Sequence, residues 1–430
     1  MKITKLSIRY GSGYISFDVP AGNLAGILSP NKSSPAADTV SEVNRALDAP
    51  IGCGGLEKIA EHCSNALIIA DDNTRLTPAR EIIPSILDRL NSAGIEDGDI
   101  TILIALGTHR PMTDSEILAK FGEETKSRVK IINHEFNDPE QLYDIGVTEN
   151  GTPIFINKLV MEYDILIGVG SIVPHHIPGF SGGAKIIQPG VCGEETTAKT
   201  HLLSVRLRRS MLGIVENGVR NEMELIAKKV NARYVFNSVI DENGKLIKGF
   251  FGDIGMAFRE GVRLSREIYG VRASGKTEIV VASSYPCDLE FWQAHKTMYA
   301  CEAVLQEGGT MIIVTPCPEG VAVMHPDIIS FAGQSPDEID EQIKSGVIKD
   351  EVAGALALAW SKIRQFSTVC IVSDGIDEET AKSLGFNHYL TVDAALEDAF
   401  LRHGSDARVT VLPSGGDILP VTDGDKQKIM

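Results

Sequence analysis

The chain has 430 residues, of which 43% are hydrophobic and 23% are charged. This balance is typical of a folded globular protein, and the length favours two or three domains over a single one. The 58 acidic side chains outnumber the 41 basic ones, and the net charge of −17 disfavours nonspecific binding to nucleic acid or to anionic membranes.

The chain begins with an alternating, strand-like stretch, and its longest apolar runs are far shorter than a membrane span. The seven cysteines are scattered, odd in number and never arranged as CxxC. This pattern favours reduced thiols and a cytoplasmic location over a disulfide framework or a cysteine-based zinc site.

Short β-branched runs alternate with amphipathic stretches through the first 270 residues. Pro78 suits a first helical turn, Gly94 suits a helix end, and Thr113 with Glu116 forms a capping box. The predicted strands are 65–71, 99–107, 128–136, 153–158 and 163–170. The predicted helices are 78–94, 113–121 and stretches near 192–204, 221–232 and 253–268.

A second series follows a small, polar, glycine-bearing linker at 271–277. The predicted strands are 277–283, 309–316, 367–373 and 407–413, and the predicted helices are 290–306, 336–346, 350–365, 377–385 and 393–403. Alternation of strand and helix predicts an α/β fold of two domains with mainly parallel sheets. We expect domains at 1–272 and 273–430, with the active site in the cleft between them.

The stretch 270–277, GVRASGKT, matches the phosphate-loop pattern GxxxxGK[ST]. That pattern binds phosphate only where a strand precedes it and a helix follows it. Here the predicted order is helix and then strand, so we interpret the stretch as an interdomain linker.

Two loops at predicted strand ends carry polar side chains. Asp72, Asn73, Thr74 and Arg75 in DDNTRLTP offer oxygen acceptors and a guanidinium that can grip a phosphate or carboxylate. The alternative is helix capping beside a surface arginine. His109 follows the next strand, where a solvated loop histidine is the alternative to a functional one.

The segment 170–201 is glycine-rich and contains His175, His176, His201 and Lys185. Such a long loop in a packed domain is usually functional, although the glycines could serve turns only and Lys185 could lie on the surface. Because neighbours in an extended loop point to opposite sides, we expect His176 to have no role beside His175.

A helix over 288–300 would place Gln293 and Lys296 on one face, where they could hold a hydroxy-carboxylate. Helical spacing directs His295 away from that face. The alternative is an exposed amphipathic helix without a ligand.

Taken together and in this order, DDNTR, GTHR, PHHIPGFSGGAK, His201 sixteen residues after Lys185, and WQAHK resemble the nickel-dependent lactate racemase family. The stretches 318–327 and 408–420 are also similar to that family, so the resemblance extends over nearly the whole chain. It implies a cofactor-binding and catalytic domain at 1–272 and a domain at 273–430 that contributes substrate-binding residues.

The resemblance implies a racemase or epimerase that inverts C2 of a 2-hydroxy acid by reversible hydride transfer, through a 2-keto acid. The implied cofactor is a nickel-pincer nucleotide, nickel(II)-pyridinium-3,5-bisthiocarboxylate mononucleotide, bound covalently to Lys185, with cofactor-assembly enzymes as partners. The other implied roles are a nickel ligand at His201, acid/base catalysis at His109 and His175, cofactor contacts from Asp72 through Arg75, and substrate binding by Arg75, Gln293 and Lys296.

This chemistry is physically reasonable, because no side chain can accept the hydride of an unactivated hydroxy acid, whereas a pyridinium can. Asn73, Leu76, Ile177 and Trp292 differ from the pattern of lactate enzymes, so the 2-hydroxy acid itself stays open. The competing hypotheses are a conventional zinc- or NAD-dependent enzyme and a non-catalytic metabolite-binding relative.

Overall fold

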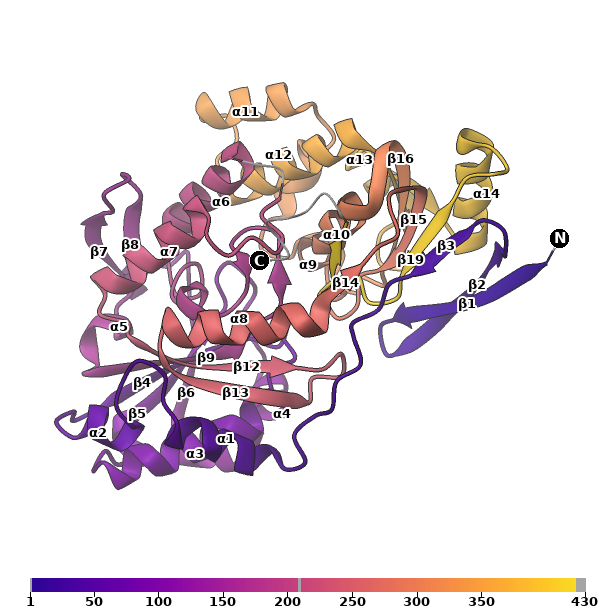
Figure 1. Cartoon of the computed structure of the whole chain (residues 1–430). Coiled ribbons are helices and arrows are strands. Elements are labelled where there is room, and N and C mark those ends of the chain that lie inside the picture. Colours follow the sequence, from indigo (N-terminus) through magenta and orange to yellow (C-terminus); the bar gives the residue numbers. More distant parts are fainter. Residues whose placement is uncertain (1, 208–209, 423–430) are drawn as a thin grey trace.

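The computed structural model describes residues 2–207 and 210–422, which form two lobes, each built on a six-stranded sheet (Figure 1). The first sheet has the order β13-β12-β9-β4-β5-β6 and is parallel except for the antiparallel pair β12–β13. Its strands are β4 (Ala66–Asp71), β5 (Ile100–Ala105), β6 (Lys130–Asn133), β9 (Ile165–Ser171), β12 (Tyr234–Ile240) and β13 (Leu246–Asp253).

Every residue of β4 is buried, because helices cover both faces of this sheet. Ile68 and Ala70 face a core shared with α1, α3 and α4, whereas Leu67 and Ile69 face a core shared with α7. The helices of this lobe are α1 (Thr39–Asp48), α2 (Leu56–Ala60), α3 (Ala79–Ser92), α4 (Asp114–Arg128), α5 (Leu159–Glu162), α6 (Glu194–Leu207), α7 (Gly218–Lys229) and α8 (Met256–Tyr269). A strand that is buried on both faces is expected to be apolar along its whole length, as most of β4 is.

The second sheet is parallel throughout and has the order β18-β17-β16-β15-β19-β3. Its strands are β3 (Leu24–Ile27), β15 (Thr277–Ser283), β16 (Leu305–Val314), β17 (Thr368–Val372), β18 (Asn387–Tyr389) and β19 (Val409–Leu412). Its helices are α9 (Phe291–Ala294), α10 (Lys296–Val304), α11 (Pro336–Lys344), α12 (Glu351–Phe366), α13 (Glu378–Ser383) and α14 (Val392–His403). The α/β class with mainly parallel sheets is thus confirmed.

The first strands of the chain belong to the second lobe (Figure 1). β3 pairs with β19, and the hairpin of β1 (Ile3–Tyr10) and β2 (Gly13–Pro20) packs its apolar side on the same sheet as α14. The division at 272/273 stays a prediction, but residues 3–27 pack with the second sheet, which local sequence patterns do not reveal. β14 (Gly270–Arg272) also pairs with β20 (Leu419–Val421) between the lobes.

Three further features differ from the predictions. The strand expected at 153–158 is β8 (Pro153–Asn157), which forms a hairpin with β7 (Leu142–Val147) outside the main sheet. The pair β12–β13 was not predicted, and the helix expected at 290–306 is divided into α9 and α10 at His295.

The phosphate-loop-like stretch 270–277 begins after α8 and ends at the first residue of β15. The order is therefore helix and then strand, as the sequence predicts.

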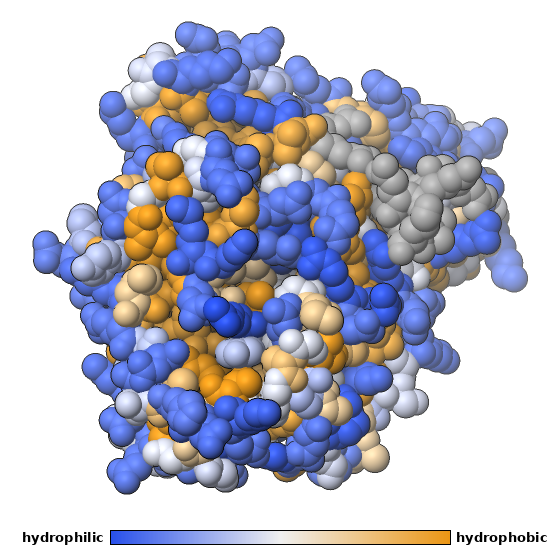
Figure 2. Space-filling model, turned by 60° about the vertical axis from the view of Figure 1, so that its left-hand side comes forward, coloured by the Kyte–Doolittle hydropathy of each residue, from blue (hydrophilic) through white to orange (hydrophobic). Residues whose placement is uncertain are grey.

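Within the described part of the chain, no helix combines the length and the apolar composition needed to cross a bilayer. One face of the molecule is mostly hydrophilic at its edges, with hydrophobic residues grouped in patches between the polar ones (Figure 2).

Candidate active site

The carboxyl ends of the central strands define where the site lies. In the first sheet β4 lies between β5 and β9, so the strands that follow it in the sequence lie on both of its sides. In the second sheet β15 has the corresponding position, between β16 and β19. Parallel sheets bind ligands in the crevice that forms where the strand order reverses. The segments after β4, β5, β9 and β15 supply most of the predicted site residues.

One cavity contains residues of both lobes and encloses about 950 Å³, counting the part of its mouth that is open to solvent. The predicted residues that line it are Asp72, Arg75, His109, His175, Lys185, His201, Gln293 and Lys296. Asn73 and Thr74 do not line it: Asn73 donates to the Glu116 carboxylate at 2.9 Å, and the Thr74 hydroxyl donates to Oδ1 of Asp72 at 2.5 Å.

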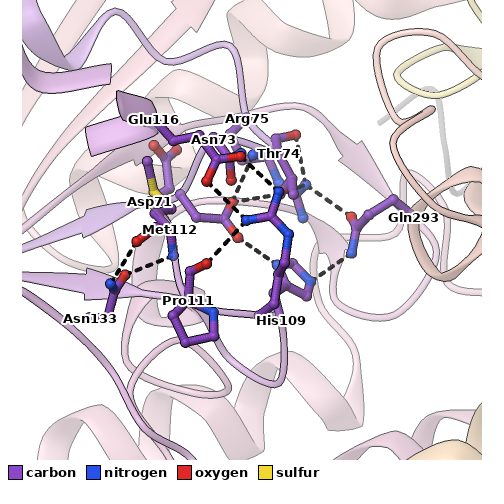
Figure 3. Close-up of polar contacts among 12 residues, drawn as sticks. Asp71, Asn73, Thr74, Arg75, His109, Pro111, Met112, Glu116, Asn133 and Gln293 are labelled. Atoms are coloured by element: carbon purple, nitrogen blue, oxygen red, sulfur yellow. Dashed lines mark hydrogen bonds and ion pairs between the residues drawn. The ribbon is translucent and has the colours of Figure 1, made fainter. Parts of the chain in front are cut away.

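A hydrogen-bonded chain crosses the cleft through His109 (Figure 3). Its Nδ1 lies 2.5 Å from Oδ2 of Asp72, and its Nε2 lies 2.6 Å from the amide nitrogen of Gln293. Burial alone would raise the pKa of Asp72, but His109 and Arg75 lower it well below its usual range. The ionised Asp72 can only accept, so His109 carries its proton on Nδ1.

The orientation of the Gln293 amide follows from its contacts with Arg75 (Figure 3) and with Lys296. Its Oε1 accepts from the Arg75 guanidinium at 3.2 Å and from the Lys296 ammonium, and both groups only donate. The Gln293 nitrogen must therefore donate to Nε2 of His109, which accepts this bond with its lone pair. Burial, followed by the charge of Arg75, lowers the pKa of Lys296 to about 8.

The glycine-rich segment after β9 is folded tightly rather than loose. It contains β10 (Pro174–His175), β11 (Gly179–Phe180) and the short 3-10 helix η3 (Gly183–Ile186). Gly179 has φ 84° and Gly182 has φ 83°, a region that favours glycine. A Cβ on Gly179 would lie 1.9 Å from the carbonyl oxygen of Ile214, so no side chain fits there.

Lys185 is half-buried on η3 and lines this cavity. Burial, and next the charges of Arg75 and Lys296, lower its pKa well below the usual value for lysine. A lowered pKa favours the neutral amine, which has a free electron pair and is the nucleophilic form of a lysine.

His201 lies on α6, and its Nδ1 donates to the carbonyl oxygen of Thr197 at 2.8 Å. This bond leaves the lone pair on Nε2, and burial lowers the pKa of the ring to about 4, so the ring is neutral. A neutral imidazole whose second nitrogen is held by a carbonyl is the usual form of a metal-binding histidine. Among the residues that the structure describes, no three His, Cys, Asp or Glu side chains are grouped to hold a metal by themselves.

His175 accepts the backbone N–H of Ile177 on Nδ1 at 3.1 Å, so its neutral ring carries the proton on Nε2. Burial, followed by Lys185 and His176, lowers its pKa well below the usual value. We expected His176 to point to the opposite side from His175, and this was wrong. The two rings stack with centroids 4.8 Å apart, and His176 also lines the cavity.

Three contributors to the site were not identified from the sequence. Arg220 is fully buried and donates to the carbonyl oxygens of Gly182 and Phe180, which holds the glycine-rich segment in place. His295 lines the cavity rather than pointing away, and Tyr299 stacks on His176 with centroids 4.1 Å apart. A strongly polar residue in the apolar periodicity of its helix is the one signal that could have marked Arg220.

Comparison with known proteins identifies the family to which this chain is similar. The family models for the lactate racemase N-terminal domain and the lactate racemase C-terminal domain match residues 10–213 and 272–419. The chain is 31% identical to the lactate racemase of Lactiplantibacillus plantarum over 422 residues, which cover 95% of this chain and 98% of the relative. It is 30% identical to that of Thermoanaerobacterium thermosaccharolyticum over 428 residues, covering 97% and 99%.

The solved structure of the apoprotein of the latter enzyme superposes with a TM-score of 0.86, at 30% identity, and covers 97% of this chain and 100% of that one. A Thermotoga maritima protein at 23% identity shares the fold, with a TM-score of 0.70 over 86% of this chain and 97% of its own. The resemblance in the sequence motifs is confirmed over both lobes. The chain therefore belongs to the lactate racemase family, a family of isomerases.

Proposed function

We propose that this protein is a racemase or epimerase that inverts C2 of a 2-hydroxy acid, using a nickel-pincer nucleotide bound covalently to Lys185. The observation that carries the proposal is the meeting, in one cavity, of a lysine amine with a lowered pKa, the free Nε2 of His201 and the pair His109 and Asp72. The lowered pKa of Lys185 and the hydrogen bonds of His201 and His109 suit these roles.

The donor set fits this cofactor. Lys185 would hold it through an amide-type bond, His201 would be the protein's ligand to nickel, and Asp72 and Arg75 would lie beside its nucleotide. Nickel(II) accepts imidazole together with sulfur donors, and a pincer ligand needs only one further ligand from the protein. When bound, the cofactor supplies a hydride acceptor that returns the hydride to either face of a 2-keto acid.

The residues of the chain supply binding and proton transfer. Arg75 and Lys296 both point to one acceptor oxygen, that of Gln293, and a substrate carboxylate would occupy such a position. In the resting state His109 offers a lone pair and His175 offers an N–H, both at Nε2. A reaction that removes a hydroxyl proton on one side and supplies one on the other needs this complementary pair.

The cavity walls serve the same chemistry by excluding water. His175 and His176 are each more than nine-tenths buried, and Trp292 is 5% exposed. Exclusion of water protects a reactive hydride and strengthens the electrostatic hold on the carboxylate. We further propose a cytoplasmic location, which is supported by the seven free cysteines.

The test is to produce the protein together with the cofactor-assembly enzymes and to measure bound metal and intact mass. We expect nickel and a mass increment in the wild type and in Lys199→Ala, which removes a partly exposed lysine of α6 paired with Glu351. Both should be absent in Lys185→Ala. Zinc, or no metal together with an unmodified mass in the wild type, would favour a conventional zinc- or NAD-dependent enzyme or a binding protein.

The hydride route has its own test. A substrate deuterated at C2 should keep its label while it is inverted, because the hydride returns without exchange with water. Rapid loss of the label to solvent would contradict hydride transfer and indicate proton abstraction from carbon.

A further inference from the structure

One wall of the cavity, next to Gln293, is the indole ring of Trp292. This ring stacks face to face on the imidazole of His325, with centroids 4.1 Å apart and planes inclined by 14°. Trp292 is 5% exposed and His325 only 2%. The indole of Trp292 therefore packs on the buried ring of His325 and also borders the cavity.

His325 is itself fixed by a carboxylate. Its Nδ1 lies 2.6 Å from Oδ2 of Asp350, whose Oδ1 accepts the backbone N–H of Ala353 at 2.8 Å and so caps α12. The same helix contributes Leu356 to the cavity lining. One helix start thus positions both apolar parts of this wall, through the chain Asp350, His325 and Trp292.

We propose that Trp292 is a specificity-determining residue, positioned by His325 and Asp350, and that the substrate is a 2-hydroxy acid with a branched apolar or aromatic side chain. This inference rests on the proposed function, because it describes the same cavity. His325 and Asp350 act through Trp292 and are positioning residues.

The placement of apolar and charged groups supports this substrate class. Ile177 lies two residues after His175, and Trp292 directly precedes Gln293, so apolar side chains line the cavity close in sequence to an acid/base residue and to a substrate-binding residue. In the described lining, the lysine and arginine side chains are Arg75, Lys185 and Lys296.

Two of these cations would hold the substrate carboxylate, and Lys185 would be consumed by the cofactor. A second carboxylate would therefore lack a cation of its own and would lose its hydration against an indole. A branched or aromatic chain gains by leaving water and stacks well on the ring.

The experiment compares four substrates on the cofactor-loaded enzyme: 2-hydroxy-4-methylpentanoate, 2-hydroxy-3-phenylpropanoate, lactate and malate. We expect kcat/KM for at least one of the first two to exceed that for lactate by about 10-fold, since added apolar groups typically give this discrimination, and malate to rank last. The substrate ratio is kcat/KM for the better apolar substrate divided by kcat/KM for lactate. His325→Ala should lower this ratio by about 10-fold, mainly by raising KM for the apolar substrates. His325→Phe keeps a flat ring and should preserve most of the ratio.

Trp292 is one of two tryptophans, so fluorescence reports on binding independently of turnover. Apolar hydroxy acids should change the emission of the wild type, and Trp292→Leu should abolish that change. His403→Ala is the matched control: it removes a contact with Thr310 at 2.8 Å in the same lobe, away from the cavity, and should leave the substrate ratio unaltered.

A preference for lactate or malate, or an unchanged ratio in both His325→Ala and Trp292→Leu, would overturn the inference. Failure of the proposed function looks different. A loaded enzyme that turns over none of the four acids would contradict the racemase proposal, whereas the fluorescence titrations would still decide whether Trp292 selects apolar ligands.

Discussion

His109 and Asp72 are joined by a 2.5 Å contact between Nδ1 and Oδ2, although they follow different strands of the sheet. Asp72 is only 3% exposed and also accepts from the hydroxyl and the backbone N–H of Thr74. Three donors on one buried carboxylate keep it ionised and stationary. The contact therefore fixes which nitrogen of His109 faces the cavity with a lone pair.

Asp72→Asn is expected to lower the turnover of a loaded enzyme by about 10²–10⁴-fold, the usual contribution of a positioned base. An amide can donate to Nδ1 and so place the proton on Nε2, where the lone pair is needed. Steady-state rates and thermal melting would separate this effect from unfolding. Asp114→Asn, at a carboxylate whose side chain is 94% exposed, should behave as wild type, and an Asp72→Asn enzyme with full turnover would contradict the assignment.

Lys296 predicts a pH limit for substrate binding. Its pKa is lowered to about 8 by burial and by Arg75, so it is charged below pH 8 and neutral above it. Because only the charged form attracts a carboxylate, the Kd of lactate should rise about 10-fold per pH unit above that value. Calorimetric titration from pH 6.5 to 10 would measure this dependence.

The control for this prediction is Lys296→Arg, because arginine keeps its charge throughout that range. Its affinity should show no loss between pH 8 and 10, whereas an identical loss in both proteins would assign the effect to another group. As pH rises, the titration of Lys296 changes the stability of the fold in the direction opposite to its effect on substrate affinity. Since the unfolded lysine titrates near 10.5, unfolding takes up a proton between pH 8 and 10.5, and this group makes the protein more stable as pH rises there.

Much of this site could be predicted because its residues directly follow strands, and strand ends are visible in the sequence. Asp72, His109 and the segment to Lys185 all follow buried β-branched runs, and parallel strands bring such ends to one edge. The glycines of that segment also follow from the sequence, since positions such as Gly182 with positive φ require them.

The rest depends on contacts between distant parts of the chain. β3 pairs with β19 almost 400 residues later in the sequence, and no local pattern encodes that choice. His295 was assigned to the wrong side because helical spacing assumes one exposed face, whereas the cavity surrounds the junction of α9 and α10. The partners of Trp292 lie 33 and 58 residues further along the chain, at His325 and Asp350.

Gly179 should be intolerant of a side chain. Alanine there would adopt φ 84° and place its Cβ 1.9 Å from the Ile214 carbonyl oxygen. Such a conformation alone costs about 1–3 kcal/mol, and the clash adds to it. Thermal or urea unfolding of Gly179→Ala would show the loss. Gly98→Ala, whose Cβ would meet nothing within 4 Å, should change stability by less than about 0.5 kcal/mol.

The final prediction concerns Arg220, the buried residue that holds the glycine-rich segment. Its guanidinium lies over the ring of Phe258, 4.1 Å from the centroid, donates to Gly182 at 2.9 Å and also donates to Phe180. A lysine keeps a positive charge but cannot reach two carbonyls with a planar fork. Arg220→Lys should therefore lose roughly 1.5–3 kcal/mol for each charged hydrogen bond that is broken.

The same substitution should lower the fraction of protein that carries the Lys185 adduct, because Gly182 and Lys185 share one tight turn. Intact mass after co-production with the assembly enzymes would measure that fraction, and urea unfolding would measure stability. Arg263→Lys, at an arginine whose side chain is 72% exposed and paired with Glu260, provides the matched control. If Arg220→Lys were as stable and as fully modified as this control, the glycine-rich segment would have to be held by its other contacts, among them the bond from the Gly183 N–H to Asn237.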